Sequence, residues 1–151
     1  MPPAEEYPTG SFEIYYFSVA AQSKKVTLRA LGIGKDNNIV VLPVGTKAPK
    51  WKVDRFYNGL YSFTIGGLSA TYRTTDNHIV VSNPADVGYT WTISHSDATS
   101  PSPVGNDAYR VYLNPPAASK AWTLPVKIKE VEDPVLFGKA ADAGLFYFKR
   151  V

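Results

Sequence analysis

A motif that occurs three times along the chain limits the possible folds more than any other feature. Each copy has a turn pair, one spacer residue, an aromatic residue and then alternating apolar residues. The copies read TGSFEI at 9–14, NGLYSF at 58–63 and NDAYRV at 106–111. Their aromatic residues, Phe12, Tyr61 and Tyr109, lie 49 and then 48 residues apart. Because a period of two is typical of a strand with one buried face, the repeat predicts three similar β-rich units.

Two further matches support the repeat. DNNIVV at 36–41 returns as DNHIVV at 76–81, and KWKV at 50–53 returns as TWTI at 90–93, both at an offset of 40 residues. The third unit ends on FYF at 146–148, which begins 55 residues after Trp91. The third unit is therefore expected to carry an insertion before its last strand.

The repeat predicts an all-β fold, a β-trefoil with twelve strands in three pseudo-repeats. We expect one domain, 1–151, with units at about 9–57, 58–105 and 106–151. The expected strands are 11–18, 26–32, 38–43 and 50–56 in the first unit, 60–66, 69–74, 78–83 and 89–95 in the second, and 108–114, 120–125, 126–131 and 145–151 in the third. Trp51 and Trp91 occupy equivalent strand positions and are expected in the core.

Composition excludes several classes of protein. The 151 residues contain no cysteine, which excludes disulfides and thiolate catalysis and favours a cytoplasmic location. Residues 1–10 have neither a basic start nor an apolar run, so we expect no signal peptide, with secretion left open. No stretch is long and apolar enough to predict a membrane span. Net charge is +3, but the basic residues are scattered, so nucleic acid is not an expected partner.

Residue types that carry chemistry are few, and their spacing predicts no enzyme, metal site or cofactor. His78 and His95 have no serine–acid arrangement or metal-ligand spacing nearby, which favours surface histidines. Glu130, Glu132 and Asp133 form the densest acidic patch. Because this patch alternates with lysines, it is interpreted as one solvated strand face. A binding module is the class that remains.

Three segments together resemble a known family. They read PV at 43–44, WKV at 51–53 and NGLYSFTI at 58–65. This pattern resembles the β-trefoil protease inhibitors of basidiomycete fungi, the mycocypins (cysteine proteases) and the mycospins (serine proteases). The resemblance implies a monomeric, reversible inhibitor in fungal defence that offers a stiff, substrate-like loop and has its target protease as partner.

The choice of target depends on the loops. Loop 19–25 contains no glycine, whereas mycocypins of the clitocypin kind carry a glycine-rich loop there, so serine proteases are favoured. The specificity pocket of a trypsin-like protease has an acidic residue at its bottom. The matching side chain of the inhibitor is therefore expected to be Lys, Arg or at least polar. Two alternatives stay open: a cysteine protease inhibitor, and a carbohydrate-binding lectin suggested by the ten tyrosines, although the Gln-x-Trp pattern of ricin-type lectins is missing.

Two loops supply the candidate protease-binding residues. The resemblance points to Lys35, Asp36, Asn37 and Asn38, a loop that some members use, although its repetition at 76–77 also suits a plain β-turn. The second candidate is Lys139, in the insertion 132–144 before the last strand. That insertion is longer than its counterparts, and length beyond the needs of the scaffold suggests use.

Overall fold

The computed structural model describes residues 9–19, 26–56, 59–83, 90–95, 108–113, 120–125 and 132–151. These residues contain thirteen strands, two short 3-10 turns and no α-helix. The strands are β1 (Gly10–Val19), β2 (Val26–Ile33), β3 (Ile39–Val41), β4 (Trp51–Arg55), β5 (Tyr61–Ile65), β6 (Leu68–Arg73), β7 (His78–Ser82), β8 (Trp91–His95), β9 (Ala108–Leu113), β10 (Lys120–Thr123), β11 (Asp133–Pro134), β12 (Leu136–Lys139) and β13 (Phe146–Arg150). The 3-10 turns are η2 (Lys35–Asn37) and η3 (Ala140–Asp142).

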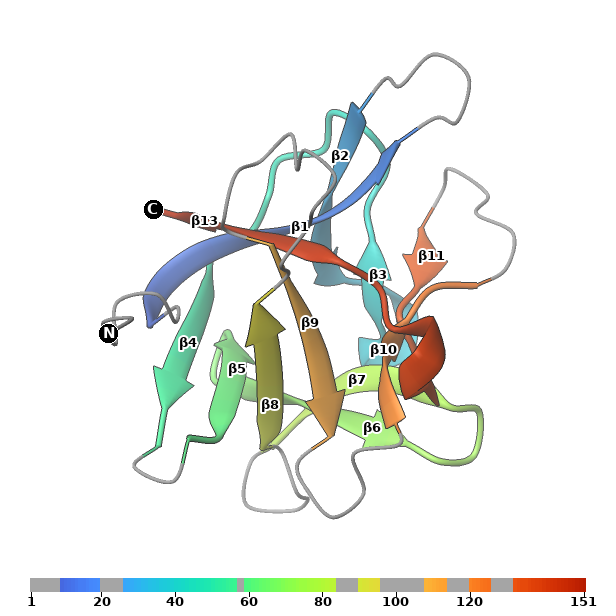
Figure 1. Ribbon diagram of the computed structural model, residues 1–151. Helices are drawn as coiled ribbons and strands as arrows, with labels where there is room; N and C mark the ends of the chain where they lie inside the picture. The colour runs from blue at the N-terminus through green and yellow to red at the C-terminus, as the bar shows by residue number, and fades with distance from the viewer. Residues whose placement is uncertain are drawn as a thin grey trace.

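Antiparallel pairing closes nine of these strands into a barrel (Figure 1). The closed ring runs β1, β4, β5, β6, β7, β12, β10, β9, β13 and back to β1. Four strands of the described residues are additional to this ring. β2, β3 and β11 follow one another outward from β1, and β8 pairs with both β5 and β9.

The expectation of a twelve-strand β-trefoil is therefore wrong, although the all-β class is correct. The three predicted units do not contribute alike to the ring. β2 and β3 of the first unit branch away from it, whereas β6 and β7 of the second and β10 and β12 of the third are part of it. β11 pairs with β3, β12 pairs with β7, and β9 meets β10 at the single pair Ala121–Tyr112. One strand of the insertion, β12, thus helps to close the ring across the predicted units, whereas β11 lies outside the ring. The expected strand 126–131 lies outside the described residues.

The predicted aromatic core is confirmed. Phe12, Tyr61 and Tyr109, the three aromatics of the repeat, are all buried, and so are Trp51 and Trp91. On β4, buried residues alternate with an outward-facing polar residue, since Lys52 is exposed between two buried neighbours. Since burying aromatic side chains contributes strongly to stability, the repeat marks the residues that hold the barrel together.

Trp122 lies at the centre of this core and was not part of the repeat. Its ring centroid is 5.2 Å from that of Phe63, 5.6 Å from Trp91 and 5.8 Å from Phe146. The indole N–H of Trp91 donates to the carbonyl oxygen of Ala70 at 3.0 Å. The indole N–H of Trp122 is buried without a hydrogen-bond partner among the described residues.

This contrast predicts unequal effects of the same substitution. Trp91→Phe removes the donor that bonds to the Ala70 carbonyl, whereas Trp122→Phe removes an N–H that has no partner in the described part of the chain. We expect Trp91→Phe to lower the free energy of unfolding by about 1 kcal/mol more than Trp122→Phe does. Urea unfolding of the two variants measures the difference, and equal losses would contradict the hydrogen-bond argument.

The acidic patch that was expected on a solvated strand face is only partly exposed to solvent. Glu132 is exposed, but Asp133 is 2% exposed and Arg29 is 4% exposed. Their side chains form an ion pair at 3.0 Å between β11 and β2. Asp133 begins β11, which pairs with β3 at Val41. This pairing joins segments far apart in the chain, so the local charge pattern did not indicate that Asp133 is buried.

Candidate functional site

The first candidate loop, 34–38, is a tight turn between β2 and β3. The Gly34 amide donates to the Asn38 carbonyl at 2.8 Å, and the Asn38 amide donates to the Lys35 carbonyl at 3.1 Å. Asp36 and Asn37 have φ values of 58° and 61°, in the left-handed region that short polar side chains tolerate. Lys35 is exposed, but it begins the 3-10 turn η2, and the two residues after it have positive φ angles.

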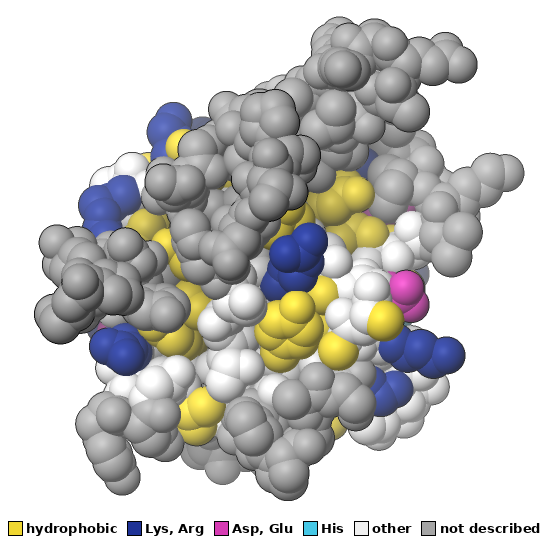
Figure 2. Space-filling view, in the orientation of Figure 1, with side chains coloured by type: hydrophobic (Ala, Val, Ile, Leu, Met, Phe, Trp, Pro, Cys, Tyr) yellow, Lys and Arg dark blue, Asp and Glu magenta, His cyan; other side chains and the backbone are white. Residues whose placement is uncertain are grey.

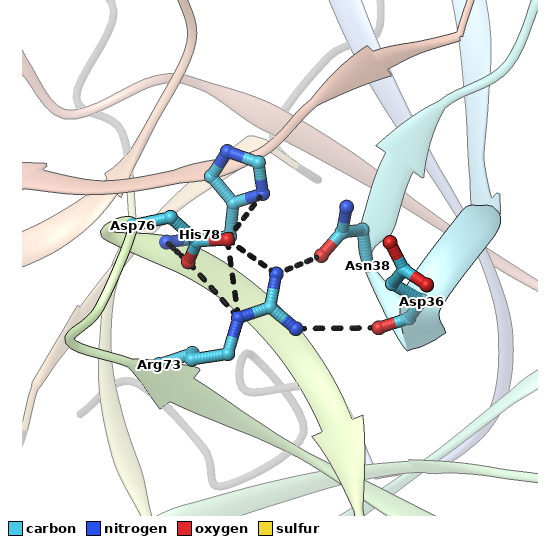
Figure 3. A network of polar contacts seen from close by, with 5 residues as sticks. All are labelled: Asp36, Asn38, Arg73, Asp76 and His78. Atoms are coloured by element: carbon cyan, nitrogen blue, oxygen red, sulfur yellow. Dashed lines mark hydrogen bonds and ion pairs between the residues drawn. The ribbon is translucent and has the colours of Figure 1, made fainter.

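Arg73 holds this loop against the neighbouring hairpin (Figure 3). Its Nε donates to both carboxylate oxygens of Asp76, at 3.0 and 3.1 Å. Its guanidinium also donates to the Asn38 side-chain oxygen at 2.8 Å and to the Asp36 carbonyl at 3.3 Å. A planar guanidinium suits such several-fold contacts. Asp36 and Asn38 are therefore engaged in holding two turns together.

Arg73 was missed in the sequence, although a signal was present. Forty residues earlier, the offset that aligns the two Asp-Asn turns, the chain carries Ile33. A position where two copies of a repeat differ so strongly marks a role outside the shared scaffold. Here the role is to join the turns on which the two copies agree.

The same contacts make this junction sensitive to pH. Hydrogen bonding from Arg73 holds the pKa of the Asp76 carboxyl below its ordinary value, and the charge of His78 acts in the same direction. A depressed folded-state pKa stabilises the fold above the unfolded pKa, and that contribution is lost as pH falls through the folded value. We expect Asp76→Asn to lower the melting temperature at pH 7, and we expect this difference from the parent to shrink as the pH falls. A difference of constant size across the acid range would show that the charge is not the cause.

The second candidate, Lys139, ends β12 and is exposed. Its φ of −70° and ψ of 140° make the backbone extended at this residue. The loop 139–144, which we call the Lys139 loop, is fixed to β10 at both ends. Lys139 pairs with Lys120, and the Gly144 amide donates to the carbonyl of buried Trp122 at 2.9 Å. Inside the loop, the Ala143 amide donates to the Ala140 carbonyl at 3.1 Å.

Gly138 is the reason that β12 can approach β10 so closely. A Cβ atom added at Gly138 would lie 2.5 Å from the Thr123 hydroxyl oxygen. A larger residue would have to displace the Thr123 side chain of β10 just before Lys139. The position of the Lys139 loop therefore depends on a glycine in the sequence.

The two candidate loops occupy different places. Leu136, at the start of β12, pairs with His78 beside the Arg73 contacts. Lys139 lies at the other end of β12, three residues further, which is about 10 Å along a strand. The structure therefore offers two separate candidate surfaces. Lys35 lies within the 3-10 turn η2, whereas Lys139 precedes the 3-10 turn η3 and its own backbone is extended.

A polar cleft of about 460 Å³ lies on the outer face of β1, β4 and β5. Ser11, Lys52 and Thr64 form a row across these strands, and Lys50 and Asp54 flank it. Trp51 reaches the lining but is only 1% exposed, so it offers no stacking surface. The cleft presents ammonium, hydroxyl and carboxylate groups to solvent.

Charge and metal chemistry add little elsewhere in the described part of the chain. On the face shown in Figure 2, Lys and Arg side chains lie in separate places rather than in one stripe.

Within the described ranges, no three His, Asp or Glu side chains gather into a possible metal site. No helix among the described residues has the length and apolarity of a membrane span. The side chain of His95 and the linker 96–107 lie outside the described residues.

Comparison with models of known protein families finds no match, and comparison with curated proteins finds none either.

Proposed function

We propose that the protein is a reversible inhibitor of trypsin-like serine proteases and that Lys139 is the side chain that enters the protease. The observation that carries this proposal is an exposed lysine whose own backbone is extended, at the start of a loop that is fixed at both ends. Proteins that bind a peptide segment by adding it to the edge of a sheet take it in extended form. Lys35 fits this requirement less well because positive φ angles follow it.

The fixed ends explain how such a loop inhibits rather than serves as a substrate. A loop that is already ordered loses little conformational freedom on binding, which favours affinity. After a cut within the Lys139 loop, the strand pairing at Lys139 and the Gly144 hydrogen bond would still hold both new ends on β10. The cut ends would then stay in place and could rejoin, which is how inhibition becomes reversible.

The lysine itself favours the trypsin-like class, whose specificity pocket has an aspartate at its base. The sequence resemblance to fungal protease inhibitors supports the same proposal and adds a role in defence. On this proposal the partner is the protease alone, with no cofactor.

Titration of trypsin with the protein tests the proposal. We expect residual activity to fall with added inhibitor and to recover on dilution, with chymotrypsin and papain much less affected. Unchanged trypsin activity at micromolar protein would contradict it, and stronger inhibition of papain would favour the cysteine protease alternative.

A further inference from the structure

Lys139 has a second lysine directly opposite it. Lys120 of β10 pairs with Lys139 of β12. Residues paired in this way project from the same face of the sheet, with Cβ atoms about 4.5–5.5 Å apart. Two like charges at this spacing repel each other when no opposite charge is near. The barrel therefore carries a charge arrangement that its own stability does not favour.

The Lys120 ammonium group lies over one aromatic ring, that of Phe137. It lies 5.8 Å from the centroid of the Phe137 ring. Phe137 in turn stacks on Tyr72 with ring centroids 4.5 Å apart and planes 11° apart. A cation over an aromatic face is attracted to it, so Lys120 is directed toward a defined place beside Lys139.

No carboxylate of the described residues neutralises the pair. The ion pairs among these residues involve Arg29, Lys52, Arg73 and His78, and neither Lys120 nor Lys139 takes part. Asp142, the carboxylate of the Lys139 loop itself, is exposed and belongs to none of these pairs. An arrangement that breaks a local rule of strand pairing without internal compensation is expected at functional sites.

We propose that Lys120 and Lys139 form a two-cation site that binds two acidic groups of one protein partner. This inference rests on the proposed function: Lys139 reaches the acid of the specificity pocket, and Lys120 contacts a second carboxylate on the protease surface next to it. Lys120 is then a specificity-determining residue, because proteases without that carboxylate gain nothing from it.

Charge reversal at Lys120 tests the site. We expect Lys120→Glu to slow association with trypsin about tenfold at low salt, with the difference shrinking at 1 M salt. Lys120→Met, which keeps the length and removes the charge, should slow it about threefold. Lys47→Glu is the control with the same change in charge, since Lys47 is exposed in the segment between β3 and β4. It should associate like the parent.

Titration with a hexa-aspartate peptide, followed by amide NMR shifts, supplies a readout that needs no protease. Shifts that centre on Lys120 and Lys139 in the parent and vanish in Lys120→Glu would support the two-cation site, even if trypsin proved not to be inhibited. The site would be wrong if Lys120→Glu associated like the parent or if the peptide left these two amides unshifted. If the parent itself did not inhibit trypsin, that result would overturn only the proposed function.

Discussion

Replacing Lys139 by alanine is expected to weaken the inhibition of trypsin about a thousandfold, while Lys139→Arg keeps it within a few-fold of the parent. A side chain that fills a deep, charged pocket is the kind of contact that dominates binding energy, and a thousandfold loss equals about 4 kcal/mol. Arginine keeps the charge that the acidic pocket recognises, whereas alanine removes it. Inhibition constants from progress curves measure both variants.

Lys35→Ala is the matched comparison, because Lys35 is an exposed lysine in the other candidate loop. This variant should inhibit like the parent, since the residues after Lys35 have positive φ angles and Arg73 donates a hydrogen bond to the Asp36 carbonyl. Melting temperatures of all three variants should stay close to that of the parent because both lysines are exposed. If Lys35→Ala lost inhibition and Lys139→Ala kept it, the reactive loop would be the turn at 34–38.

The sequence predicted the core well because strand alternation and repeated aromatics are local signals. Phe12, Tyr61 and Tyr109 needed no knowledge of strand partners to be placed inside. The same local character explains why Lys139 could be named as a candidate, because the insertion at 132–144 is visible as a difference in length between copies. Features that depend only on a local pattern, such as the inward-facing aromatics, could therefore be predicted from the sequence.

The closure of the barrel was not predictable in the same way. The pairing of β12 with β7, and of β11 with β3, joins segments far apart in the chain. An alternating strand fixes which residues face inward but does not choose its partner. The repeat therefore suggested three like units, whereas the insertion supplied strands that pair across them.

The Lys139 loop shows the same limit at the level of the site. The strand pairing at Lys139 and the hydrogen bond from Gly144 to Trp122 depend on where β10 lies relative to β12. Lys120 is nineteen residues before Lys139 in the sequence, and no repeat or motif connects the two lysines. Only the strand pairing brings them to one face.

Removal of the buried carboxylate of Asp133 should destabilise the fold more than removal of an exposed one. The Arg29 guanidinium also donates to the carbonyls of Leu42 and Val41, at 2.9 and 3.1 Å, so it cannot easily leave the interior. Breaking a buried ion pair from one side costs about 3–5 kcal/mol because a charge is left in the interior without its counter-charge. We expect Asp133→Ala to lower the free energy of unfolding by that amount, as measured by urea unfolding.

Asp54→Ala provides the matched control. Asp54 pairs with Lys52 at 3.9 Å on the barrel surface, with both side chains well exposed. Exposed pairs of this kind contribute about 0–1 kcal/mol, so this variant should remain near the parent. Equal losses in the two variants would contradict the assignment of Asp133 as a buried structural partner.

The Asp133 variant also separates the scaffold from the site. β11 is anchored on β3, whereas the Lys139 loop is anchored on β10 at both ends. Folded molecules of Asp133→Ala should therefore inhibit trypsin like the parent when the concentration of folded protein is used to calculate the inhibition constant. Weaker inhibition by the folded fraction would mean that the pairing of β11 with β3 helps to position Lys139, and that the reactive loop depends on contacts beyond β10.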